Sequence, residues 1–539
     1  MSWSQIQVDQ PRSSTSTFSN HSIGLSEREQ EARMSSQKEP TVGLTDAKSL
    51  APLPNANKYS QIVTRFAPNP DFVLHIGSLR AVFLSHDYAR MYKGKFILRF
   101  EDTDPRLKKS VLEYYGQIEN DVKWLGCQWD EEYIMSDRVP IYYEYAEKAL
   151  GQGFAFVCTC EPDQFKAIIE SGRACPHRPR SPAENLELWH KMLSGGLKER
   201  EAVVRVKTET THPNPAVRDW PAFRIIDPEK YPHPRVGSKY RVWPLYNFSA
   251  AVDDHLMGIT HIIRGKEHLT NAVRQTYLYK HMGWSYPEAI EYGRLKMIGF
   301  KLSKSEMVKE LEEGLVDGFD DPRIPTIASL RRRGYSPDAL RKIVHEMGAR
   351  PVDATLSWDN INATNRKEID KLAHRYNFIP NPVPMDVDHV SQAFEAHLPL
   401  HPELPSLGNR TLKVVPRDGI ARIWLSGSDL QVFEKSKVVR LMELFNVEIH
   451  STNPDLVKAT FHSQEYAKAR ELKAPLIQWV PDDQHISCEV VMPDATRTKG
   501  FGETNLLGEH VGNIIQMVRF GFGRIDSKEE PLTIYFAHK

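Results

Sequence analysis

The chain has 539 residues, in which 70 Lys and Arg residues balance 70 Asp and Glu residues, so its formal net charge at pH 7 is zero. A neutral chain is no general binder of polyanions, and any contact with nucleic acid must come from local basic patches. The length predicts roughly three or four domains, and five cysteines argue against a disulfide scaffold. No apolar run is long enough for a membrane span, and the N-terminus lacks the layout of a secretory signal. We therefore expect a cytoplasmic protein of several globular domains.

The first elements of the chain predict a tail followed by an α/β sheet. Residues 1–58 are rich in Ser, Gln, Thr, Asn and Pro and contain few large apolar side chains, which predicts a disordered tail. Residues 62–66 then read as a buried strand, 77–91 carry apolar residues at helical spacing, and 95–100 predict the next strand. Strand, loop, helix and strand form the unit of a parallel α/β sheet.

The rest of the chain predicts an insertion, a helical region and a β-rich end. Turn signals are dense between about 150 and 240, and a strand pattern resumes around 245–252 and at 261–263. Helical patterning dominates from about 325 to 375. After Pro380, short apolar runs alternate with Gly, Pro, Asp and Asn, which predicts β-barrels or sandwiches.

The first segment with chemical content is 67–78, Ala-Pro-Asn-Pro-Asp-Phe-Val-Leu-His-Ile-Gly-Ser, between the first strand and helix. A helix N-terminus offers free N–H groups and positive potential to a phosphate. Gly77 allows a ligand close to the backbone, and His75 can donate a hydrogen bond to an oxygen that gains charge during phosphoryl displacement. A lone His-x-Gly at a helix start is also a common structural feature.

The second segment is Lys301-Leu302-Ser303-Lys304-Ser305, in which two lysines flank hydroxyl groups. This composition suits a mobile clamp on a triphosphate, although an isolated loop of this kind is more often a solvated turn. Together, in this order and about 225 residues apart, the two segments predict an ATP-using enzyme.

The pair resembles the two nucleotide-binding signatures of class I aminoacyl-tRNA synthetases. Three further stretches, 63–70, 96–104 and 252–260, closely resemble the glutamyl-tRNA synthetase family. Residues 320–326 and 330–334, with the β-rich C-terminal part, are similar to its archaeal-type branch and to glutaminyl-tRNA synthetases, whereas bacterial-type members end in helical anticodon domains. The resemblance covers about 59–539.

This resemblance implies a multidomain α/β plus β fold with a Rossmann-like catalytic domain. The expected regions are a tail at 1–58, the first half of the catalytic domain at 59–150, an acceptor-binding insertion at 151–240, the second half of the catalytic domain at 241–310, a helical connecting region at 311–378 and β-barrel anticodon-binding domains at 379–539.

The reaction implied by the resemblance has two steps. L-Glutamate attacks the α-phosphorus of MgATP to give glutamyl-adenylate, and the 2′-hydroxyl of the terminal tRNA adenosine then takes the glutamyl group. His75 and Lys304 would stabilise the phosphate in the transition state, with Lys301 and Ser303 supporting them. ATP phosphates and water would hold Mg²⁺, so no protein ligand is assigned to it. The expected ATP-binding residues are Ala67, Asn69, His75, Gly77, Ser78, Lys301, Leu302 and Lys304.

The glutamate substrate needs cations for its two carboxylates and an acid for its ammonium group. Arginines at strand ends face the crevice where ligands of such sheets bind, and their planar fork pairs bidentately with a carboxylate. The family motifs imply that Arg65 binds the side-chain carboxylate and Glu101 the ammonium group, unless Glu101 merely caps a turn. The other expected contacts are Ala67, Tyr246 and Arg264.

Two positions depart from the family patterns. Ser78 stands where the first superfamily signature has His, which leaves that position's role open. Ala250 stands where many bacterial-type relatives carry a substrate-contacting Asn, so that contact is not expected here.

Cys158-Thr159-Cys160 and Cys175-Pro176-His177 place four metal-binding side chains in one loop-rich stretch. Cys158, Cys160, Cys175 and His177 suit tetrahedral Zn²⁺, and some glutamyl-tRNA synthetases carry a similar cluster in the acceptor-binding insertion. The alternative is buried thiols without metal beside a surface histidine.

Arg331-Arg332-Arg333 follow the second signature, in a region that contacts the inner corner of tRNA in the family, and phosphate binding suits such a cluster. A charge run can also be a solvated face. The barrels would read the anticodon. The expected partners are tRNA(Glu), ATP and L-glutamate, with tRNA(Gln) left open, and we expect a monomer.

Three competing interpretations remain. A glutaminyl-tRNA synthetase typically has a Pro-Glu-Pro-Asn-Gly lead before its His-Ile-Gly, and Arg65 favours an anionic side chain over an amide. The relative that glutamylates queuosine lacks the C-terminal half. A non-catalytic tRNA-binding paralogue would be expected to lose His75 or the Lys301–Ser305 loop, and both are present.

Overall fold

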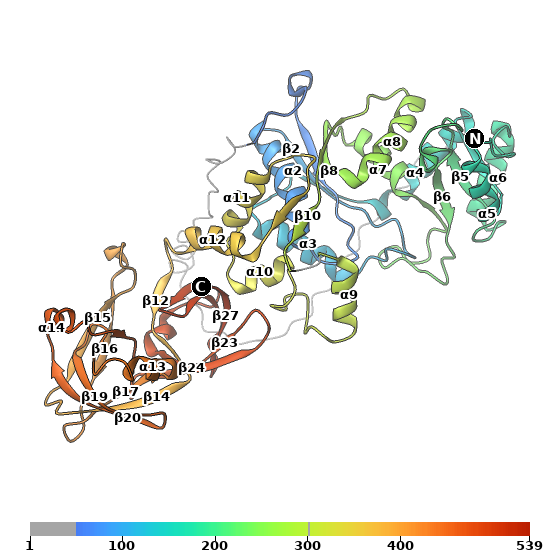
Figure 1. Ribbon diagram of the computed structural model, residues 1–539. Helices are drawn as coiled ribbons and strands as arrows, with labels where there is room; N and C mark the ends of the chain where they lie inside the picture. Colours follow the sequence, from blue (N-terminus) through green and yellow to red (C-terminus); the bar gives the residue numbers. More distant parts are fainter. Residues whose placement is uncertain (1–49, 300–301) are drawn as a thin grey trace, which may run out of the picture. The chain divides into compact units, whose positions relative to one another are not determined.

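The computed structural model describes residues 50–299 and 302–539 (Figure 1). The expected tail lies outside the described residues as far as residue 49. Among the helices that are described, none combines the length and the apolar character that a membrane crossing requires.

A parallel sheet forms the centre of the N-terminal half. Strands β1 (Val63–Phe66), β2 (Lys95–Phe100) and β3 (Glu131–Ile134) pair in parallel, as predicted for the first two. Strands β8 (His261–Gly265) and β9 (Glu288–Tyr292) form a second parallel pair. The Thr260 N–H donates to the Val63 carbonyl at 2.9 Å, which places β8 beside β1. The strands are therefore arranged as a doubly wound parallel sheet, with the order β3-β2-β1-β8-β9.

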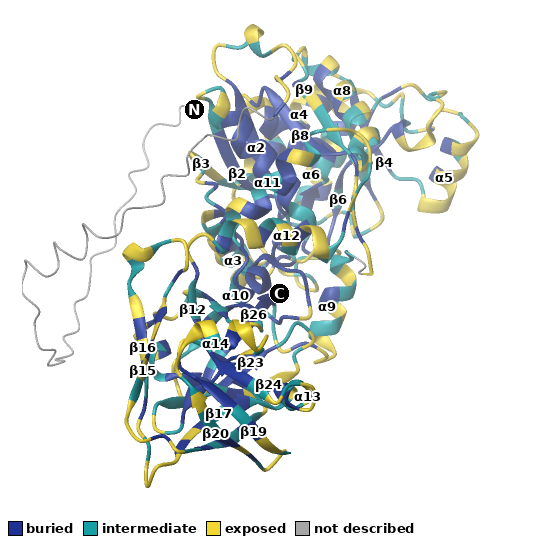
Figure 2. Ribbon diagram, turned by 60° about the vertical axis from the view of Figure 1, so that its left-hand side comes forward, coloured by how far each residue is buried: buried dark blue, intermediate teal, exposed yellow. Residues whose placement is uncertain are grey.

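Helices cover this sheet and supply its apolar core. The helix predicted at 77–91 begins with the 3-10 turn η3 (Ile76–Ser78) and continues as α2, of which Val82, Phe83 and Leu84 are fully buried. Figure 2 shows that α2 and β2 are mostly buried. The helices of this half are α2 (Leu79–Met91), α3 (Leu112–Trp124), α4 (Val139–Gly151), α7 (Tyr246–Leu256) and α8 (Leu269–Met282).

Residues 50–58 correct the predicted tail boundary. Leu50 and Leu53 are each only 5% exposed and belong to the core around the parallel sheet. The Leu53 N–H donates to the Tyr92 hydroxyl at 2.9 Å, and η2 (Ala56–Lys58) follows. Two leucines among polar residues do not change the average composition of the segment, yet they are enough to anchor it.

The strand predicted around 245–252 is wrong, because this segment is helix α7. Every residue from Asn247 to Asp254 is buried, so the helix shows no polar face from which a helical period could be read. Ala250 and Ala251 let the backbone pack closely within the core that it shares with the insertion.

The predicted insertion is a separate antiparallel sheet with two helices. The sheet has the strand order β4-β5-β6-β7, and Figure 1 shows α5 and α6 beside it. A Ser181 capping box begins α6. The elements are β4 (Ala155–Cys158), α5 (Pro162–Glu170), α6 (Pro182–Ser194), β5 (Val203–Val206), β6 (Pro221–Ile225) and β7 (Val242–Pro244).

The segment from 295 to 369 is mostly helical, as the pattern at about 325–375 predicted for its second half, and it contains one short parallel strand pair. Strand β10 (Leu295–Met297) pairs with β11 (Ala354–Leu356). The helices are α9 (Lys304–Glu312), α10 (Ile327–Arg333), α11 (Pro337–Met347) and α12 (Trp358–Ile369). Side chains at their N-caps, such as Thr326 before α10, accept hydrogen bonds from the first turn.

The C-terminal part contains two seven-stranded sheets, each with its own apolar core. The outer strands of one sheet are β12 and β13, which only Asn377 separates in the chain. The outer strands of the other, β21 and β22, are separated only by residues 478–479. In each sheet the two outer strands are thus close neighbours in the chain, as expected where a sheet closes into a barrel. The predicted fold class is confirmed.

The strands of these barrels correspond to the short apolar runs of the sequence. They are β12 (His374–Tyr376), β13 (Phe378–Pro380), β14 (Pro382–Asp388), β17 (Ala421–Ser426), β18 (Val438–Leu441), β19 (Asn446–Asn453), β20 (Leu456–Ser463), β21 (Leu476–Ile477), β22 (Val480–Pro481), β23 (His485–Val491), β24 (Arg497–Glu503), β25 (Ile514–Met517), β26 (Gly521–Ser527) and β27 (Leu532–His538). A hairpin, β15 (Phe394–Pro399) with β16 (Asn409–Val414), and the short helices α13 (Leu430–Phe433) and α14 (Tyr466–Glu471) complete the region.

Candidate active site

His75 is the N-cap of the turn η3, and its ring is fixed by the glycine two residues later. The Gly77 N–H donates to His75 Nδ1 at 3.1 Å. A Cβ on Gly77 would lie 2.6 Å from the ring, so only glycine fits this arrangement. Because burial lowers the pKa of His75 to about 4, the imidazole is neutral near pH 7. A neutral ring that accepts at Nδ1 carries its proton on Nε2, where it can serve as a donor.

The backbone around His75 is held by the segment that precedes α10. The Ile76 N–H donates to the Pro325 carbonyl, and the Ile327 N–H donates to the Leu74 carbonyl, both at 2.9 Å. These two bonds make an antiparallel bridge between His75 and Thr326. The first signature is therefore braced by residues about 250 positions later in the chain.

The second signature meets the first through an ion pair. Lys301 lies outside the described residues. Ser303 is the N-cap of α9 and accepts from the Glu306 N–H, and Lys304 begins the helix. The Lys304 ammonium group pairs with the carboxylate of Asp71 in the first signature. Burial lowers the pKa of Lys304 to about 8, so its charge is easily lost in alkaline solution.

A small apolar cluster joins the same two segments. Phe72 and Val73 pack with Met307 of α9 and with Val316 and Ile324. This cluster is separate from the core of the sheet. It brings the two signatures together, as the sequence predicted for an ATP-binding pair.

A cavity of about 410 Å³ opens at the ends of β1 and β2. Its volume falls in the range of about 300–1,000 Å³ that is usual for small-molecule sites. Glu101, Tyr246 and Asn69, all predicted from the sequence, line it. The buried oxygens Asn69 Oδ1 and Asn247 Oδ1 have no hydrogen-bond partner in the described chain, so the cavity presents unsatisfied polar atoms to a ligand.

Four charged groups form a continuous network beside this cavity. Arg65 donates to both oxygens of Asp254, from Nε at 3.1 Å and from Nη2 at 3.4 Å. Arg99 bridges Asp254 Oδ1, at 2.7 Å, and Glu101 Oε1, at 3.0 Å. Burial acts to raise the pKa of Asp254, but the two guanidinium groups lower it overall. Burial raises the pKa of Glu101 and raises that of Tyr246 to about 12.

The two arginines expected to bind glutamate are not among the residues that line the cavity. Arg65 is 5% exposed, and its Nη1 has no protein partner in the described part of the chain. Arg264 is also 5% exposed and donates to Gln275 Oε1 at 3.1 Å and to the Tyr286 hydroxyl at 2.9 Å. Both guanidinium groups are thus oriented by neighbouring side chains before any ligand arrives.

Sequence reasoning missed several residues of the cavity wall. Lys108 and Arg274 add positive charge, while His268 and Asn271 add polar groups. They lie in the loop after β2, in the turn η6 (Lys266–His268) and at the start of α8. The position of His268, three residues after the end of β8, was an available signal, because side chains at the carboxyl ends of parallel strands gather at the ligand crevice.

Comparison with known proteins identifies the family. The model of the family described as "tRNA synthetases class I (E and Q), catalytic domain" matches residues 61–371. Two models for the anti-codon binding domain of the same group match residues 373–463 and 476–526. The chain belongs to the class I tRNA synthetases of the E and Q group.

Curated members of this synthetase family are similar over most of the chain. A glutamate–tRNA ligase of Pyrococcus furiosus is 49% identical over 92% of this chain and 85% of its own length. One of Hyperthermus butylicus is 49% identical over 89% of this chain and 84% of its own. One of Pyrobaculum islandicum is 45% identical over 91% and 84%. A crystal structure of a glutamate tRNA ligase from Elizabethkingia meningosepticum matches 58% of this chain and 70% of its own at 22% identity and a TM-score of 0.44.

The insertion of this synthetase holds the four residues predicted as metal ligands in one cluster. The donor atoms of Cys158, Cys160, Cys175 and His177 all lie within 4.8 Å of one another. Cys175 Sγ is 3.6 Å from Cys158 Sγ and 3.7 Å from Cys160 Sγ, and Cys160 Sγ is 3.3 Å from His177 Nδ1. Tetrahedral zinc with Zn–S bonds of about 2.3 Å separates its sulfur ligands by about 3.8 Å. The side chains present therefore fit a zinc ion.

A neighbouring hydroxyl orients the imidazole of this cluster. The Thr159 hydroxyl is 3.1 Å from His177 Nε2, which leaves Nδ1 facing the thiols. Such a contact to the outer ring nitrogen is the usual support of a metal-binding histidine. All five cysteines of the chain are free thiols, and Cys127 and Cys488 are buried elsewhere.

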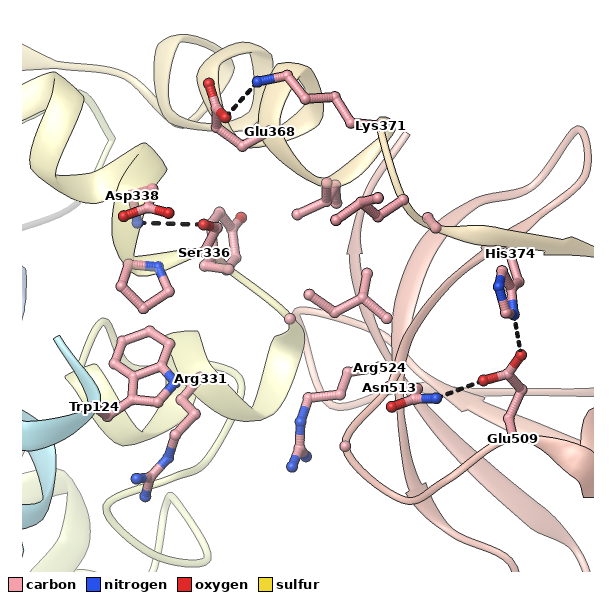
Figure 3. A pocket seen from close by; sticks show the side chains of 18 residues that line it. Trp124, Arg331, Ser336, Asp338, Glu368, Lys371, His374, Glu509, Asn513 and Arg524 are labelled. Carbon is pink, nitrogen blue, oxygen red and sulfur yellow. Dashed lines mark hydrogen bonds and ion pairs between the residues drawn. The ribbon is translucent and has the colours of Figure 1, made fainter. Parts of the chain in front are cut away.

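The three consecutive arginines of α10 have three different environments. Arg333 is 5% exposed and donates to the carbonyls of Phe536 and Ala537. Arg332 pairs with Asp320 and, through two nitrogens, with Asp526 of β26. Arg331 has no hydrogen-bond or ion-pair partner within 50–299 and 302–539, and it lines a cavity with Trp124 (Figure 3).

Proposed function

We propose that the chain is a glutamate–tRNA ligase, which joins L-glutamate to tRNA with ATP as the energy source. The similarity to glutamate–tRNA ligases over nine-tenths of the chain supports this function. The observation that carries the proposal is the ion pair between Lys304 and Asp71 of the His75 segment, together with a cavity that Asn69 of the same segment, Glu101 and Tyr246 line.

In the first step, a carboxylate oxygen of glutamate attacks the α-phosphorus of ATP, the bond to the bridging oxygen of the β-phosphate breaks, and pyrophosphate leaves. His75 would donate from Nε2 to a phosphate oxygen, and Lys304 would neutralise developing charge. Ser303 and Lys301 would support the lysine, and Ala67, Asn69, Gly77, Ser78 and Leu302 would line the nucleotide. Mg²⁺ would arrive with ATP, held by phosphates and water.

For glutamate, the proposed ligands are one cation and one acid of the network beside the cavity. Arg65 keeps Nη1 free for the side-chain carboxylate while Asp254 fixes its plane. Glu101 would accept from the substrate ammonium group, with Tyr246, Arg264 and Ala67 around the remaining atoms. A guanidinium group in this position favours a carboxylate over the amide of glutamine.

In the second step, the terminal adenosine of tRNA attacks the carbonyl carbon of glutamyl-adenylate through its 2′-hydroxyl, and AMP leaves. We propose that the insertion binds the acceptor end, that the barrels bind the anticodon, and that the α10 arginines lie towards the tRNA. Single-stranded bases are usually read by stacking and by contacts to their edges, which the barrels would provide.

We also propose that Zn²⁺ occupies the Cys158, Cys160, Cys175 and His177 cluster and stabilises the insertion. Metal analysis of the purified chain should give a single zinc ion per molecule. Cys160→Ser should lose it and lower the melting temperature, whereas Cys488→Ser should keep it. Purified protein without metal, and an unchanged melting temperature for Cys160→Ser, would contradict the zinc site.

The function is tested by charging purified tRNA(Glu) and tRNA(Gln) side by side with labelled glutamate and labelled glutamine. We expect glutamate on tRNA(Glu), and glutamate on both tRNAs would add tRNA(Gln) as a second substrate. Glutamine on tRNA(Gln) would replace the proposal with a glutaminyl enzyme, and no product with either tRNA would remove the enzymatic function. We expect the reaction to take place in the cytoplasm and the enzyme to be a monomer. Light scattering of the purified chain would measure its oligomeric state.

A further inference from the structure

The loop that follows β2 forms one wall of the cavity that Glu101 lines. We refer to residues 101–108 as the Glu101 loop. Its residues on the cavity side are Glu101, Thr103, Asp104 and Lys108. Asp102 does not line the cavity, and it is only 1% exposed. The position of the Glu101 side chain depends on where this loop holds its backbone.

Residues of the parallel-sheet half hold the beginning of the Glu101 loop. The Asp102 carboxylate accepts from the Ser136 N–H at 2.8 Å, from the Ser136 hydroxyl at 2.7 Å and from the Tyr115 hydroxyl at 2.6 Å. The Glu101 N–H donates to the Pro68 carbonyl at 2.9 Å. These contacts fix the Asp102 side chain and the peptide before Glu101, but not the peptide that follows Asp102.

The peptide after Asp102 is held by a histidine of the insertion. His233 lies in the loop 226–241, which joins β6 to β7, and its side chain is completely buried. His233 Nε2 donates to the Asp102 carbonyl at 2.8 Å. Within the loop, His233 and Gly237 exchange two backbone hydrogen bonds, of 3.0 and 2.8 Å. A tight turn of the insertion thus reaches the residue next to Glu101.

The contacts around the ring of His233 determine which nitrogen carries the proton. Nδ1 accepts from the Arg235 N–H at 3.2 Å and from the Val236 N–H at 3.4 Å. An imidazole that accepts at Nδ1 and donates at Nε2 is neutral. Burial lowers the pKa of His233, which favours the same form. The ring also stacks on Trp243, with 5.1 Å between the centroids and 26° between the planes, which restricts its rotation.

Attachment of the insertion does not require this hydrogen bond. One hydrogen bond between neutral groups adds little to stability, because folding replaces bonds that both partners make with water. A buried carbonyl that loses its donor must, however, move to find another partner. Removal of the His233 donor should therefore shift the Glu101 loop without detaching the insertion. The insertion shares a large apolar core with α4, α7 and α8, to which Tyr142, Phe223, Phe248 and Leu278 belong.

We propose that His233 is a positioning residue of the glutamate site, because it holds the Asp102 carbonyl and thereby sets the position of the Glu101 carboxylate. The inference rests on the proposed function, since it takes Glu101 as the ligand of the substrate ammonium group. Arg99 binds one oxygen of Glu101 at 3.0 Å, so a shift of the loop would turn the carboxylate about that contact. His233 should therefore affect recognition of the ammonium group and no other part of the substrate.

The test compares glutamate with glutarate, which has both carboxylates but no ammonium group. Calorimetric titration measures the dissociation constants of both for the full-length chain and for two amide variants. In His233→Asn the side-chain oxygen takes the place of Nδ1 and keeps the contacts within the loop, but the side chain is too short to reach the Asp102 carbonyl. The longer side chain of His233→Gln can still donate to that carbonyl.

We expect His233→Asn to lower the preference for glutamate over glutarate about tenfold, since a displacement of about 1 Å can cost up to a hundredfold. Its affinity for glutarate and its KM for ATP should match those of the wild type. His233→Gln should retain most of the preference. An inactive fraction of protein changes the stoichiometry of the titration and not the dissociation constants, so partial misfolding does not imitate this result.

His281→Leu is the matched control. His281 also donates to a carbonyl of the insertion, that of Lys207 at 2.7 Å, and stacks on Phe154, but it does not line the cavity. This variant should keep the wild-type preference, even where its melting temperature falls. An unchanged preference in His233→Asn, or an equal fall of both affinities, would overturn the proposal. A His233→Asn chain that does not fold would show that the contact is structural, and this result would also overturn it.

Equilibrium binding separates this inference from the proposed function. If the wild-type chain prefers glutamate and charges tRNA(Glu), but His233→Asn keeps the preference, only the role of His233 fails. If His233→Asn loses the preference and the wild-type chain charges no tRNA, only the enzymatic proposal fails. A wild-type chain that charges tRNA(Glu) but binds the two dicarboxylates equally would remove the role of Glu101, and this inference with it, while the ligase activity would stand.

Discussion

The first signature, 67–78, and the second, 301–305, of which residues 302–305 are described, differ in what fixes them. His75 is held by the Gly77 N–H and by a backbone bridge at Thr326, so its position does not depend on any charge. Lys304 is held by an ion pair with Asp71, which any anion can replace. A neutral donor in a rigid backbone suits an oxygen that gains charge only in the transition state. A cation with an exchangeable partner suits a phosphate that must enter and leave.

Removing the exchangeable cation should have the largest effect. Lys304→Gln should lower kcat for glutamate charging about a thousandfold, at the low end of the 10³–10⁵ range for a cation that stabilises phosphoryl transfer. The rate of glutamyl-tRNA formation at saturating substrate measures it. Lys309→Gln, an exposed lysine of the same helix, is the control and should keep full activity. A loss below tenfold would show that Lys304 is not part of the reaction.

Removing the fixed donor should cost somewhat less. His75→Ala should reduce kcat about a hundredfold, as for the loss of one preorganised hydrogen-bond donor. His190→Gln, on the exposed side of α6, should leave kcat unchanged. Because the pKa of His75 is about 4, the wild-type rate should not fall between pH 7 and pH 5 through this group. A decline centred near pH 6 that disappears in His75→Ala would contradict a neutral donor.

Displacing the donor without removing it should have an intermediate effect. Gly77→Ala places a Cβ within 2.6 Å of the His75 ring, so the ring must turn and lose its hydrogen bond. We expect kcat to fall about tenfold or more, since a shift of about 1 Å can cost up to a hundredfold. Gly116→Ala in α3 meets no atom within 4 Å and should be silent in the same charging assay. Equal activity of the two variants would mean that the ring position is unimportant.

Changing the partner of the lysine should have the smallest effect. Asp71→Asn removes the anion that competes with ATP, so the KM for ATP at pH 7 should fall about threefold. This corresponds to about 0.65 kcal/mol of binding free energy. The pKa of Lys304 is about 8, and its charge, hence activity, is lost as the pH rises through that value. Loss of the neighbouring carboxylate disfavours the charged form, so the alkaline decline should move to lower pH. A decline that moves to higher pH would contradict this account.

Much of the fold could be predicted from the sequence because its strands are short, apolar and bounded by turn residues. Strands β1 and β2 and the barrel strands follow this rule. The turn signals between about 150 and 240 also predicted the insertion that interrupts the first sheet. Helix α7 could not be identified, because burial of every residue from Asn247 to Asp254 removes the exposed face that reveals a helical period. The anchor at Leu50 and Leu53 was hidden by the polar residues around it.

The candidate site was predictable where a motif joins residue type to position. His75, Glu101 and the Cys-x-Cys and Cys-x-His pairs are of this kind: His75 caps a turn, Glu101 lines a cavity, and the three thiols and the imidazole form one cluster. Contacts between distant segments determine the partners of Arg65 and Arg264. They also determine which of the three α10 arginines is buried, which is paired and which is unpaired. No local pattern contains that information.

Helix α10 has a mechanical consequence. Its N-cap, Thr326, forms a backbone bridge with His75. In its last turn, Arg332 pairs with Asp526, and Arg333 donates a hydrogen bond to a carbonyl of β27. Seven helical residues span only about 10 Å. A helix this short can hardly lengthen or shorten along its axis. A rotation of the barrel against the catalytic sheet must therefore either break the arginine contacts or tilt the peptide bonds that carry His75.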